Sequence, residues 1–358
     1  MMISLGIMTM SKRSEQTYIN EMAKRANQHD IKCYRFIPTD INPATQLISG
    51  EYFNPATLKW EACNFPLPSL LYDRCFYQED FHSQQCKAIV SWMKTNHQSR
   101  FLGIGLPNKL ELYKELRQTA ISPYLPESEP FTSTKDFIKQ LTTGKPLVLK
   151  PIDGSQGKGI YVIEKYDNHF LIKTDKQTNH IAHTLSLQAA ANWLAKLTRK
   201  YRYLIQPYLY LQNECNQPFD LRIFMQKTEA GTWRELTRGM RTGSEGGIIS
   251  NISAGGKFSP YEVWLQTIPA NQQTFLSAEL EEILAKLPAI LDNKFPPLFE
   301  IGVDIGIESN GAIWILDINS KPGRKLVLET RPDLADDLYS APFLYGKTLV
   351  STDALEGR

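Results

Sequence analysis

A glycine-rich stretch in the middle of the chain, KPIDGSQGKGIYVIE at 150–164, has the composition of a loop that contacts phosphate. Glycine lets a backbone approach a ligand closely and turn its amides inward. A Walker loop and a dinucleotide-binding fingerprint are both excluded, because Lys158 is followed by Gly159 and a strand pattern instead of a helix. The stretch predicts either a glycine-rich hairpin that covers phosphates or a plain tight turn.

Three oxygen-bearing side chains alternate with apolar residues near the C-terminus, Asp304 in VDIGI and Asp317 with Asn319 in ILDIN. An Asn-Gly pair between the two segments is typical of a hairpin turn. Alternate residues of adjacent strands share a face, so these oxygens are expected to converge. Two carboxylates and an amide suit Mg²⁺, and clustered acids without a cation are costly to bury. The neighbours expected to face the core are Val303, Ile305, Leu316 and Ile318.

Cations of a kind that binds phosphate or carboxylate oxygens occur at Lys150, at the end of the strand entering the glycine loop, and at Arg222, Arg241 and Arg324. A guanidinium can bind such oxygens in a bidentate manner. Each of these residues taken alone is more often structural, and only the set as a whole indicates a phosphate site. No Ser-His-Asp or Cys-His pattern accompanies them, and the 6 histidines are dispersed.

Strand and helix signals alternate over the first hundred residues, which favours an α/β layer with a largely parallel sheet. Strands are expected at 3–10, 31–38, 69–77 and 100–105, with helices at 14–30 and 81–97. Further on, the strands 145–152 and 159–166 flank the glycine loop, and 201–211 reads as one strand. The remaining expectations are helices at 108–118, 132–141, 187–200 and 275–291 and antiparallel pairs 219–227 with 233–243 and 299–309 with 312–320.

Composition gives no reason to expect a nucleic-acid or membrane partner. The net charge of 358 residues is +2, and no apolar run approaches the roughly 20 residues of a membrane span. The 5 cysteines are widely spaced without a C-x-x-C pair, which argues against a disulfide framework or a structural zinc site. The apolar start reads as a buried strand and not as a signal peptide. A cytoplasmic protein is therefore expected.

In their order along the chain, these motifs resemble the ATP-grasp superfamily. That order is a lysine on a strand, a glycine-rich flap, an adenine-contacting strand, D-x-R, a further arginine, N…GG, and a terminal D…D-x-N. The D-L-R, S-N-x-x-x-G-G and D-I-N-S-K-P-G segments resemble ligases that add amino acids to peptide ends. With the Y-D-R near Asp73 and the helix N-K-x-x-x-Y-K, nearly the whole chain is similar to the YheC/YheD group, which is associated with the endospore coat.

The resemblance implies an α/β fold, α+β in part, of the ATP-grasp type. It implies an N-terminal pre-ATP-grasp domain at 1–106, a central lid subdomain with the flap at 107–205, a C-terminal subdomain at 206–347 with the adenine hinge and metal site, and a tail at 348–358. It also implies an ATP-dependent ligase that joins a small-molecule or peptide carboxylate to an amine through an acyl phosphate, releasing ADP and phosphate.

Site roles follow from the same resemblance. Contacts to ATP are expected from Lys109, Lys150, the flap residues Gly154, Ser155, Gln156, Gly157, Lys158 and Gly159, the hinge residues Gln206, Pro207, Tyr208 and Leu209, and Glu214 at the ribose. One or two Mg²⁺ ions, replaceable by Mn²⁺, are expected on Asp304, Asp317 and Asn319. The catalytic residues expected at the transferring phosphate or acyl intermediate are Arg241, Arg222 and Asn251. The family usually has glutamate where Asp317 stands, one methylene longer.

Two other readings stay open: a small-molecule kinase of the same fold, and a non-catalytic, nucleotide-binding coat protein. A homodimer and association with the spore coat are further expectations. Contacts to the carboxylate and amine are expected from the first hundred residues, with Asp73 and Arg74 as candidates, and from the loop 241–257. For Arg74, an ion pair with a neighbouring acid is an equal alternative.

Overall fold

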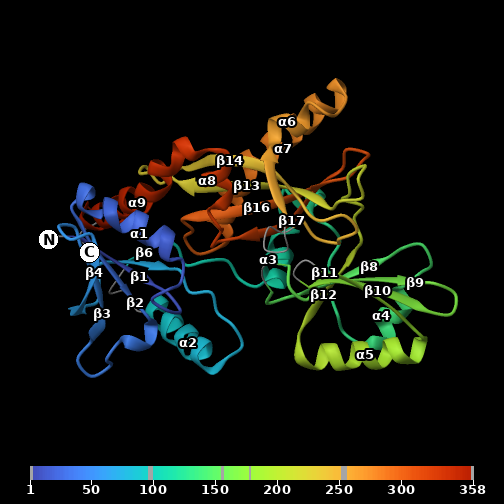
Figure 1. Ribbon diagram of the computed structural model, residues 1–358, viewed down its shortest axis with the longest axis horizontal. Coiled ribbons are helices and arrows are strands. Elements are labelled where there is room, and N and C mark those ends of the chain that lie inside the picture. The colour runs from blue at the N-terminus through green and yellow to red at the C-terminus, as the bar shows by residue number, and fades with distance from the viewer. Residues whose placement is uncertain (1–2, 96–99, 155–156, 177–178, 251–255, 356–358) are drawn as a thin grey trace.

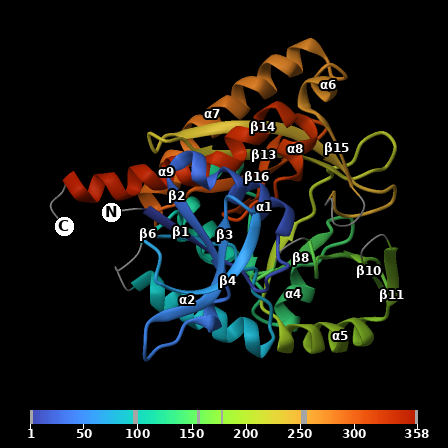
Figure 2. The same cartoon turned by 60° about the vertical axis from the view of Figure 1, so that its left-hand side comes forward.

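The computed structural model describes residues 3–95, 100–154, 157–176, 179–250 and 256–355. These residues form three sheets with helices packed on them. The N-terminal sheet and the sheet that carries the glycine-rich loop, here called the lid sheet, lie on opposite sides of Figure 1. The C-terminal sheet lies across the top between them, and Figure 2 shows the same arrangement from a second direction.

The N-terminal sheet has the order β4-β3-β2-β1-β5-β6 and is parallel from β2 to β6, as its sequence pattern predicts. The hairpin of β3 and β4 is an antiparallel addition that the sequence reading missed. The bounds of the elements are β1 (Ile3–Met8), α1 (Gln16–Arg25), β2 (Ile31–Phe36), β3 (Leu47–Asn54), β4 (Lys59–Pro66), β5 (Leu70–Asp73), α2 (Phe81–Thr95) and β6 (Arg100–Phe101).

The lid sheet has the order β11-β10-β9-β8-β12-β7, and α4 and α5 cover one of its faces. The strands β8 and β9 pair antiparallel on either side of the glycine-rich loop, which confirms the predicted hairpin. The strand β12 ends at Pro207, which lacks an amide proton, so the single strand expected over 201–211 is shorter than predicted. The elements are β7 (Glu129–Pro130), α4 (Thr134–Gln140), β8 (Leu147–Pro151), β9 (Tyr161–Lys165), β10 (Phe170–Lys176), β11 (Asn179–Leu185), α5 (Leu187–Lys200) and β12 (Tyr203–Pro207).

The C-terminal sheet is antiparallel, with the order β15-β14-β13-β16-β17. One face packs against α3, α6 and α7, and the other against α8 and α9. The helix α3 therefore lies in the core of this sheet, with Leu112 and Leu116 buried there. The elements are α3 (Lys109–Leu116), β13 (Phe219–Lys227), β14 (Trp233–Thr242), β15 (Lys257–Pro260), α6 (Tyr261–Leu265), α7 (Ala270–Lys294), β16 (Glu300–Ile307), β17 (Ile313–Asn319), α8 (Lys325–Thr330) and α9 (Ala335–Leu355).

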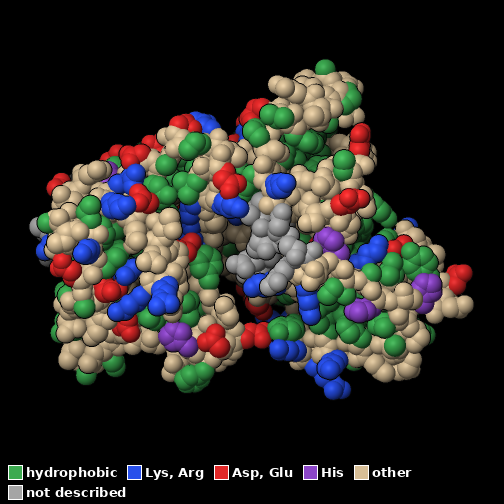
Figure 3. All heavy atoms as spheres, in the orientation of Figure 1, with side chains coloured by type: hydrophobic (Ala, Val, Ile, Leu, Met, Phe, Trp, Pro, Cys, Tyr) green, Lys and Arg blue, Asp and Glu red, His purple; other side chains and the backbone are tan. Residues whose placement is uncertain are grey.

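Neither α7 nor α9, nor any shorter helix in the part of the chain that the structure describes, is long and apolar enough to cross a membrane. On the face that Figure 3 shows, Lys and Arg side chains are scattered among Asp and Glu side chains on a surface that is mostly uncharged.

A buried charge cluster joins the N-terminal sheet to the C-terminal sheet. The Arg74 guanidinium, at the end of β5, donates to Glu15 at 2.6 and 2.7 Å and to Glu300 at 2.8 Å. Arg324 donates to both oxygens of Glu300 at 2.6 and 2.8 Å. Arg74 is fully buried and Arg324 nearly so, so their charges depend on these two carboxylates. Of the alternatives for Arg74, the contacts favour the ion pair, and Arg324 lies in the same cluster instead of facing a phosphate.

Glu300 is the acid shared by both arginines, so its loss should destabilise the protein strongly. We expect Glu300→Gln to lower the free energy of unfolding by about 3–5 kcal/mol, because two guanidinium groups stay buried with one acid. Urea unfolding followed by circular dichroism measures the change. The control is Glu282→Gln, which removes only an exposed ion pair with Lys286 and should shift stability by less than about 1 kcal/mol. Equal shifts in the two variants would contradict the role of the cluster.

Candidate functional site

A cavity of about 810 Å³ lies where the three sheets approach one another. Its lining residues come from the lid sheet, the C-terminal sheet and the N-terminal domain. Most of the site residues proposed from the sequence line it: Lys109, Lys150, Gly154, Gly157, Lys158, Gln206, Pro207, Tyr208, Leu209, Arg222, Arg241, Asp304, Asp317 and Asn319. Residues far apart in the sequence therefore meet at one place.

Strand register brings the acids of the cavity together. In the β16–β17 hairpin Asp304 is directly opposite Asp317, and Gly302 is opposite Asn319. A bulge follows Asp304, and the extra residue on β17 is Leu316. The expectation that Leu316 faces the core is therefore wrong: it lines the cavity beside Asp317. The other three predicted core neighbours, Val303, Ile305 and Ile318, are buried as expected.

Arginines from the neighbouring strands neutralise Asp304. The strand β13 places Arg222 opposite Asp304, and the two form an ion pair. Gly302 permits this approach, since a Cβ there would overlap the Arg222 guanidinium. Arg241 of β14 lies 2.9 Å from Asp304 Oδ1. Burial alone would raise the pKa of Asp304, but the two guanidinium groups hold it below its usual range.

Arg241 is itself fixed by a second acid that the sequence reading did not single out. Its guanidinium donates to both oxygens of Asp220, at 2.6 and 2.7 Å, and Ser250 Oγ donates to Asp220 at 2.6 Å. Asp220 is buried and lies on the same face of β13 as Arg222, two residues before it. Its place two residues before Arg222 was the signal that could have identified it.

Asp317, the other acid of the pair, accepts hydrogen bonds from one lysine and one side-chain amide. Lys109 Nζ lies 2.5 Å from Asp317 Oδ2, and Asn319 Nδ2 donates to the same oxygen at 3.2 Å. Among the described residues, Asp304 and Asp317 each accept their contacts through a single oxygen, which leaves the second oxygen of each for a ligand in the cavity. Two such oxygens with the Asn319 amide fit a hard cation such as Mg²⁺. No group of three His, Cys, Asp or Glu side chains with metal-site geometry occurs in the described ranges.

The protonation state of Lys150 depends on its surroundings. It lies in β8 and lines the cavity next to Lys109. Burial, reinforced by the like charge of Lys109, lowers the pKa of Lys150 to about 8. An anion entering the cavity would restore the charged form, so the residue is suited to binding one.

Residues of the flap and of the hinge both line the cavity, and both belong to the lid sheet, in which β8 pairs with β12. Gly157 and Gly159 have φ of 69° and 75°, values that favour glycine, and Gly159 does not line the cavity. Ser155 and Gln156 lie outside the described residues, as does Asn251. At the hinge, Gln206 Nε2 donates to Ser128 Oγ at 2.5 Å. Glu214 lies on an exposed turn and is not among the lining residues.

The N-terminal part of the chain contributes a wall of the cavity through residues other than Asp73 and Arg74, the two that the sequence had offered. Ser14, Glu15 and Phe76 line the cavity together with Lys321, which follows β17. Lys321 Nζ donates to Asp73 Oδ1 at 2.7 Å and to the Cys75 carbonyl at 2.8 Å. Asp73, which the sequence offered as a substrate contact, is buried behind Lys321 and touches the cavity only through it.

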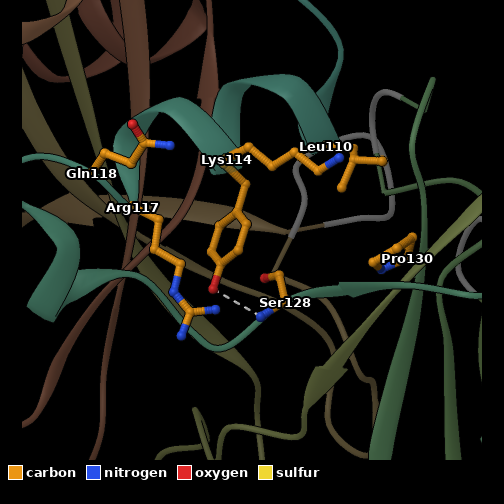
Figure 4. A pocket seen from close by; sticks show the side chains of 7 residues that line it. Leu110, Lys114, Arg117, Gln118, Ser128 and Pro130 are labelled. Carbon is orange, nitrogen blue, oxygen red and sulfur yellow. Dashed lines mark hydrogen bonds between the residues drawn. The ribbon is translucent and has the colours of Figure 1, made fainter.

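A second hollow, of about 530 Å³, lies beside α3 and contains none of the proposed site residues. In Figure 4, Lys114, Arg117 and Gln118 project from this helix, and Ser128 and Pro130 lie on the segment opposite. Tyr113 Oη accepts from the Ser128 amide at 2.9 Å, the dashed line in the figure. The Ser128 hydroxyl, which lines this hollow, accepts a hydrogen bond from Gln206, which lines the main cavity.

Comparison with known proteins identifies relatives of both the sequence and the fold. A model of YheC/D-like ATP-grasp proteins matches residues 98–349. The endospore coat-associated protein YheC of Bacillus subtilis (strain 168) is 36% identical over 361 residues, covering 99% of this chain and 98% of that protein.

Two solved structures are similar in fold. The D-alanine-D-alanine ligase from Coxiella burnetii has a TM-score of 0.51 at 10% identity, covering 99% of both chains. An N5-carboxyaminoimidazole ribonucleotide synthetase in complex with ADP also has a TM-score of 0.51, at 11% identity, covering 90% of this chain and 71% of that chain. Such low identities concern the fold alone, and they confirm the predicted α/β architecture. The sequence matches go further, and by them the chain belongs to the YheC/D-like ATP-grasp family.

Proposed function

We propose that the protein is an ATP-dependent carboxylate–amine ligase that forms an acyl phosphate and releases ADP and phosphate. The observation that carries the proposal is the convergence, in one cavity, of the Asp304–Asp317 pair with two arginines and two lysines. Stabilising phosphoryl transfer requires positioning and charge neutralisation and no enzyme nucleophile. The names of the structural relatives, a D-alanine-D-alanine ligase and an ADP-bound synthetase, agree with this reading.

Each residue has a role in this proposal. Asp304, Asp317 and Asn319 would hold Mg²⁺, which when bound neutralises phosphate oxygens. Lys109, Lys150 and the flap would bind the phosphates, and residues 206–209 would contact the adenine. Arg222, Arg241 and Asn251 would stabilise the charge on the transferring group. Glu214 is kept as the proposed ribose contact, which it would reach from its exposed turn.

The substrates are a small-molecule or peptide carboxylate and an amine, bound between the flap and the wall formed by the N-terminal domain. We further propose that the protein works in association with the spore coat, since its relative YheC carries that name. A homodimer is also proposed.

The decisive experiment incubates the protein with ATP, Mg²⁺ and fractionated metabolites, and reads ADP release together with product mass. A new amide bond with one ADP per product supports the ligase. A phosphate ester would identify a kinase instead. Calorimetry with ADP and Mg²⁺ completes the test, because nucleotide binding without any turnover would indicate a non-catalytic protein.

Removing a charged group at the acid–arginine centre should abolish turnover while the fold remains. We expect Arg241→Ala and Asp304→Ala each to lower the rate of ADP formation by at least about 100-fold. The first removes a positive charge that would stabilise the transferring phosphate, and the second removes a proposed ligand of the Mg²⁺ ion that would neutralise it. Circular dichroism checks the fold. Arg234→Ala, on the same strand but in an exposed ion pair with Asp337, should retain activity. Normal turnover in the Arg241 or Asp304 variant would refute the assignment of this centre.

Nucleotide affinity should depend on pH through Lys150. Below about pH 8 the Lys150 ammonium is charged in the free protein and attracts phosphate; as the pH rises through its pKa of about 8 the charge is lost. We therefore expect the affinity for a non-hydrolysable ATP analogue with Mg²⁺ to fall between pH 7 and 9, by up to about tenfold. Lys150→Arg keeps its charge over this range. A decline of equal size in that variant would show that another group titrates.

A further inference from the structure

Asp175, near the end of β10 in the lid sheet, has a buried carboxylate to which the proposed function gives no role. Its side chain is 3% exposed. On one side it accepts from His180 Nδ1, its cross-strand partner on β11, at 2.8 Å. On the other side its Oδ2 accepts from two successive backbone amides, those of Ile248 at 2.9 Å and Ile249 at 3.1 Å.

These two amides belong to the segment 243–250, which follows β14 and lines the cavity through Ile248, Ile249 and Ser250. The contact thus joins the lid sheet to a loop of the C-terminal sheet. The approach is close, because a Cβ at Gly247 would lie 2.8 Å from the His180 ring. Hydrogen bonds from backbone amides to a carboxylate are charge-assisted and stronger than those between neutral groups.

The next residue of the loop connects this contact to Arg241. Ser250 Oγ donates to Asp220 Oδ2 at 2.6 Å, and Asp220 holds the Arg241 guanidinium at 2.6 and 2.7 Å. Arg241 in turn lies 2.9 Å from Asp304. Two sets of hydrogen bonds, joined by the backbone between Ile249 and Ser250, therefore connect the lid to the acid–arginine centre.

We propose that Asp175 is a positioning residue: it fixes the loop 243–250 against the lid so that Ser250 and Asp220 orient Arg241 toward the transferring group. The inference rests on the proposed function for its catalytic consequence, but the loop contact itself can be measured without turnover. Asp175 is not among the residues that line the cavity in which the nucleotide is proposed to bind. Its loss should consequently slow the reaction without removing the groups that bind ATP.

The experiment compares Asp175→Ala and Asp175→Asn with the wild type in the full chain. Hydrogen–deuterium exchange reads the Ile248 and Ile249 amides, which we expect to exchange at least about tenfold faster in Asp175→Ala and at an intermediate rate in Asp175→Asn, which keeps one acceptor oxygen. The affinity for ADP with Mg²⁺ should change by less than about threefold. With substrates that support turnover, kcat should fall about tenfold or more while KM for ATP stays nearly constant.

The matched control is Asp167→Asn, an exposed acid in the β9–β10 connection of the same lid sheet, which should change none of these quantities. Ser250→Ala provides a second check, because it should lower kcat while the Ile248 and Ile249 amides stay protected. Unchanged exchange in Asp175→Ala would overturn the contact. Faster exchange with unchanged kcat, or a parallel fall of kcat and ADP affinity, would overturn the positioning role. If the wild type never turns over, the proposed function fails, while exchange still decides on the loop contact.

Discussion

The antiparallel register of β13, β16 and β17 is the constraint on which the site depends. It places Arg222, Asp304 and Asp317 side by side on three adjacent strands, where their charges must compensate one another. Buried acids so close together are tolerated only with cations between or beside them. A shift of one residue would turn these side chains to the opposite face of the sheet and remove the site altogether.

The strand β16 also connects the C-terminal sheet to the N-terminal sheet. Glu300 and Asp304 lie four residues apart on β16, hence on one face, and each acid is held by two arginines. Glu300 forms an ion pair with Arg74 of the N-terminal sheet, whereas Asp304 forms ion pairs with Arg222 of β13 and Arg241 of β14. The wall of the cavity that carries Ser14 and Phe76 is therefore positioned by the strand that carries the acid pair. The strand β16 therefore contributes both to the stability of the protein and to the candidate site.

The lid sheet completes the cavity through polar contacts instead of a shared apolar core. Its hydrophobic residues form a cluster of their own with α4 and α5. Asp175 connects the lid to the loop 243–250, and the Lys109 amide at the start of α3 donates to the Ile152 carbonyl of the glycine-rich stretch. Contacts of this kind can break and reform at small cost compared with an apolar core. That is a suitable property for a part that, under the proposed function, would admit and release a nucleotide.

The sequence by itself determined the fold class, both hairpins that carry the glycine loop and the acids, and 14 of the residues that line the cavity, because alternation, turn residues and charged types are local properties. It could not determine which arginine faces which acid. Arg324 and Arg241 look alike in the sequence, yet one is buried at the domain junction and the other lines the cavity. Leu316 likewise faces the cavity only because a bulge shifts the alternation. Hydrogen bonds to partners 21 to 248 residues away hold three further residues in position: Asp220, Asp175 and Lys321. Only the tertiary structure decided these pairings, since the energy of a buried charge depends on neighbours that the chain brings from elsewhere.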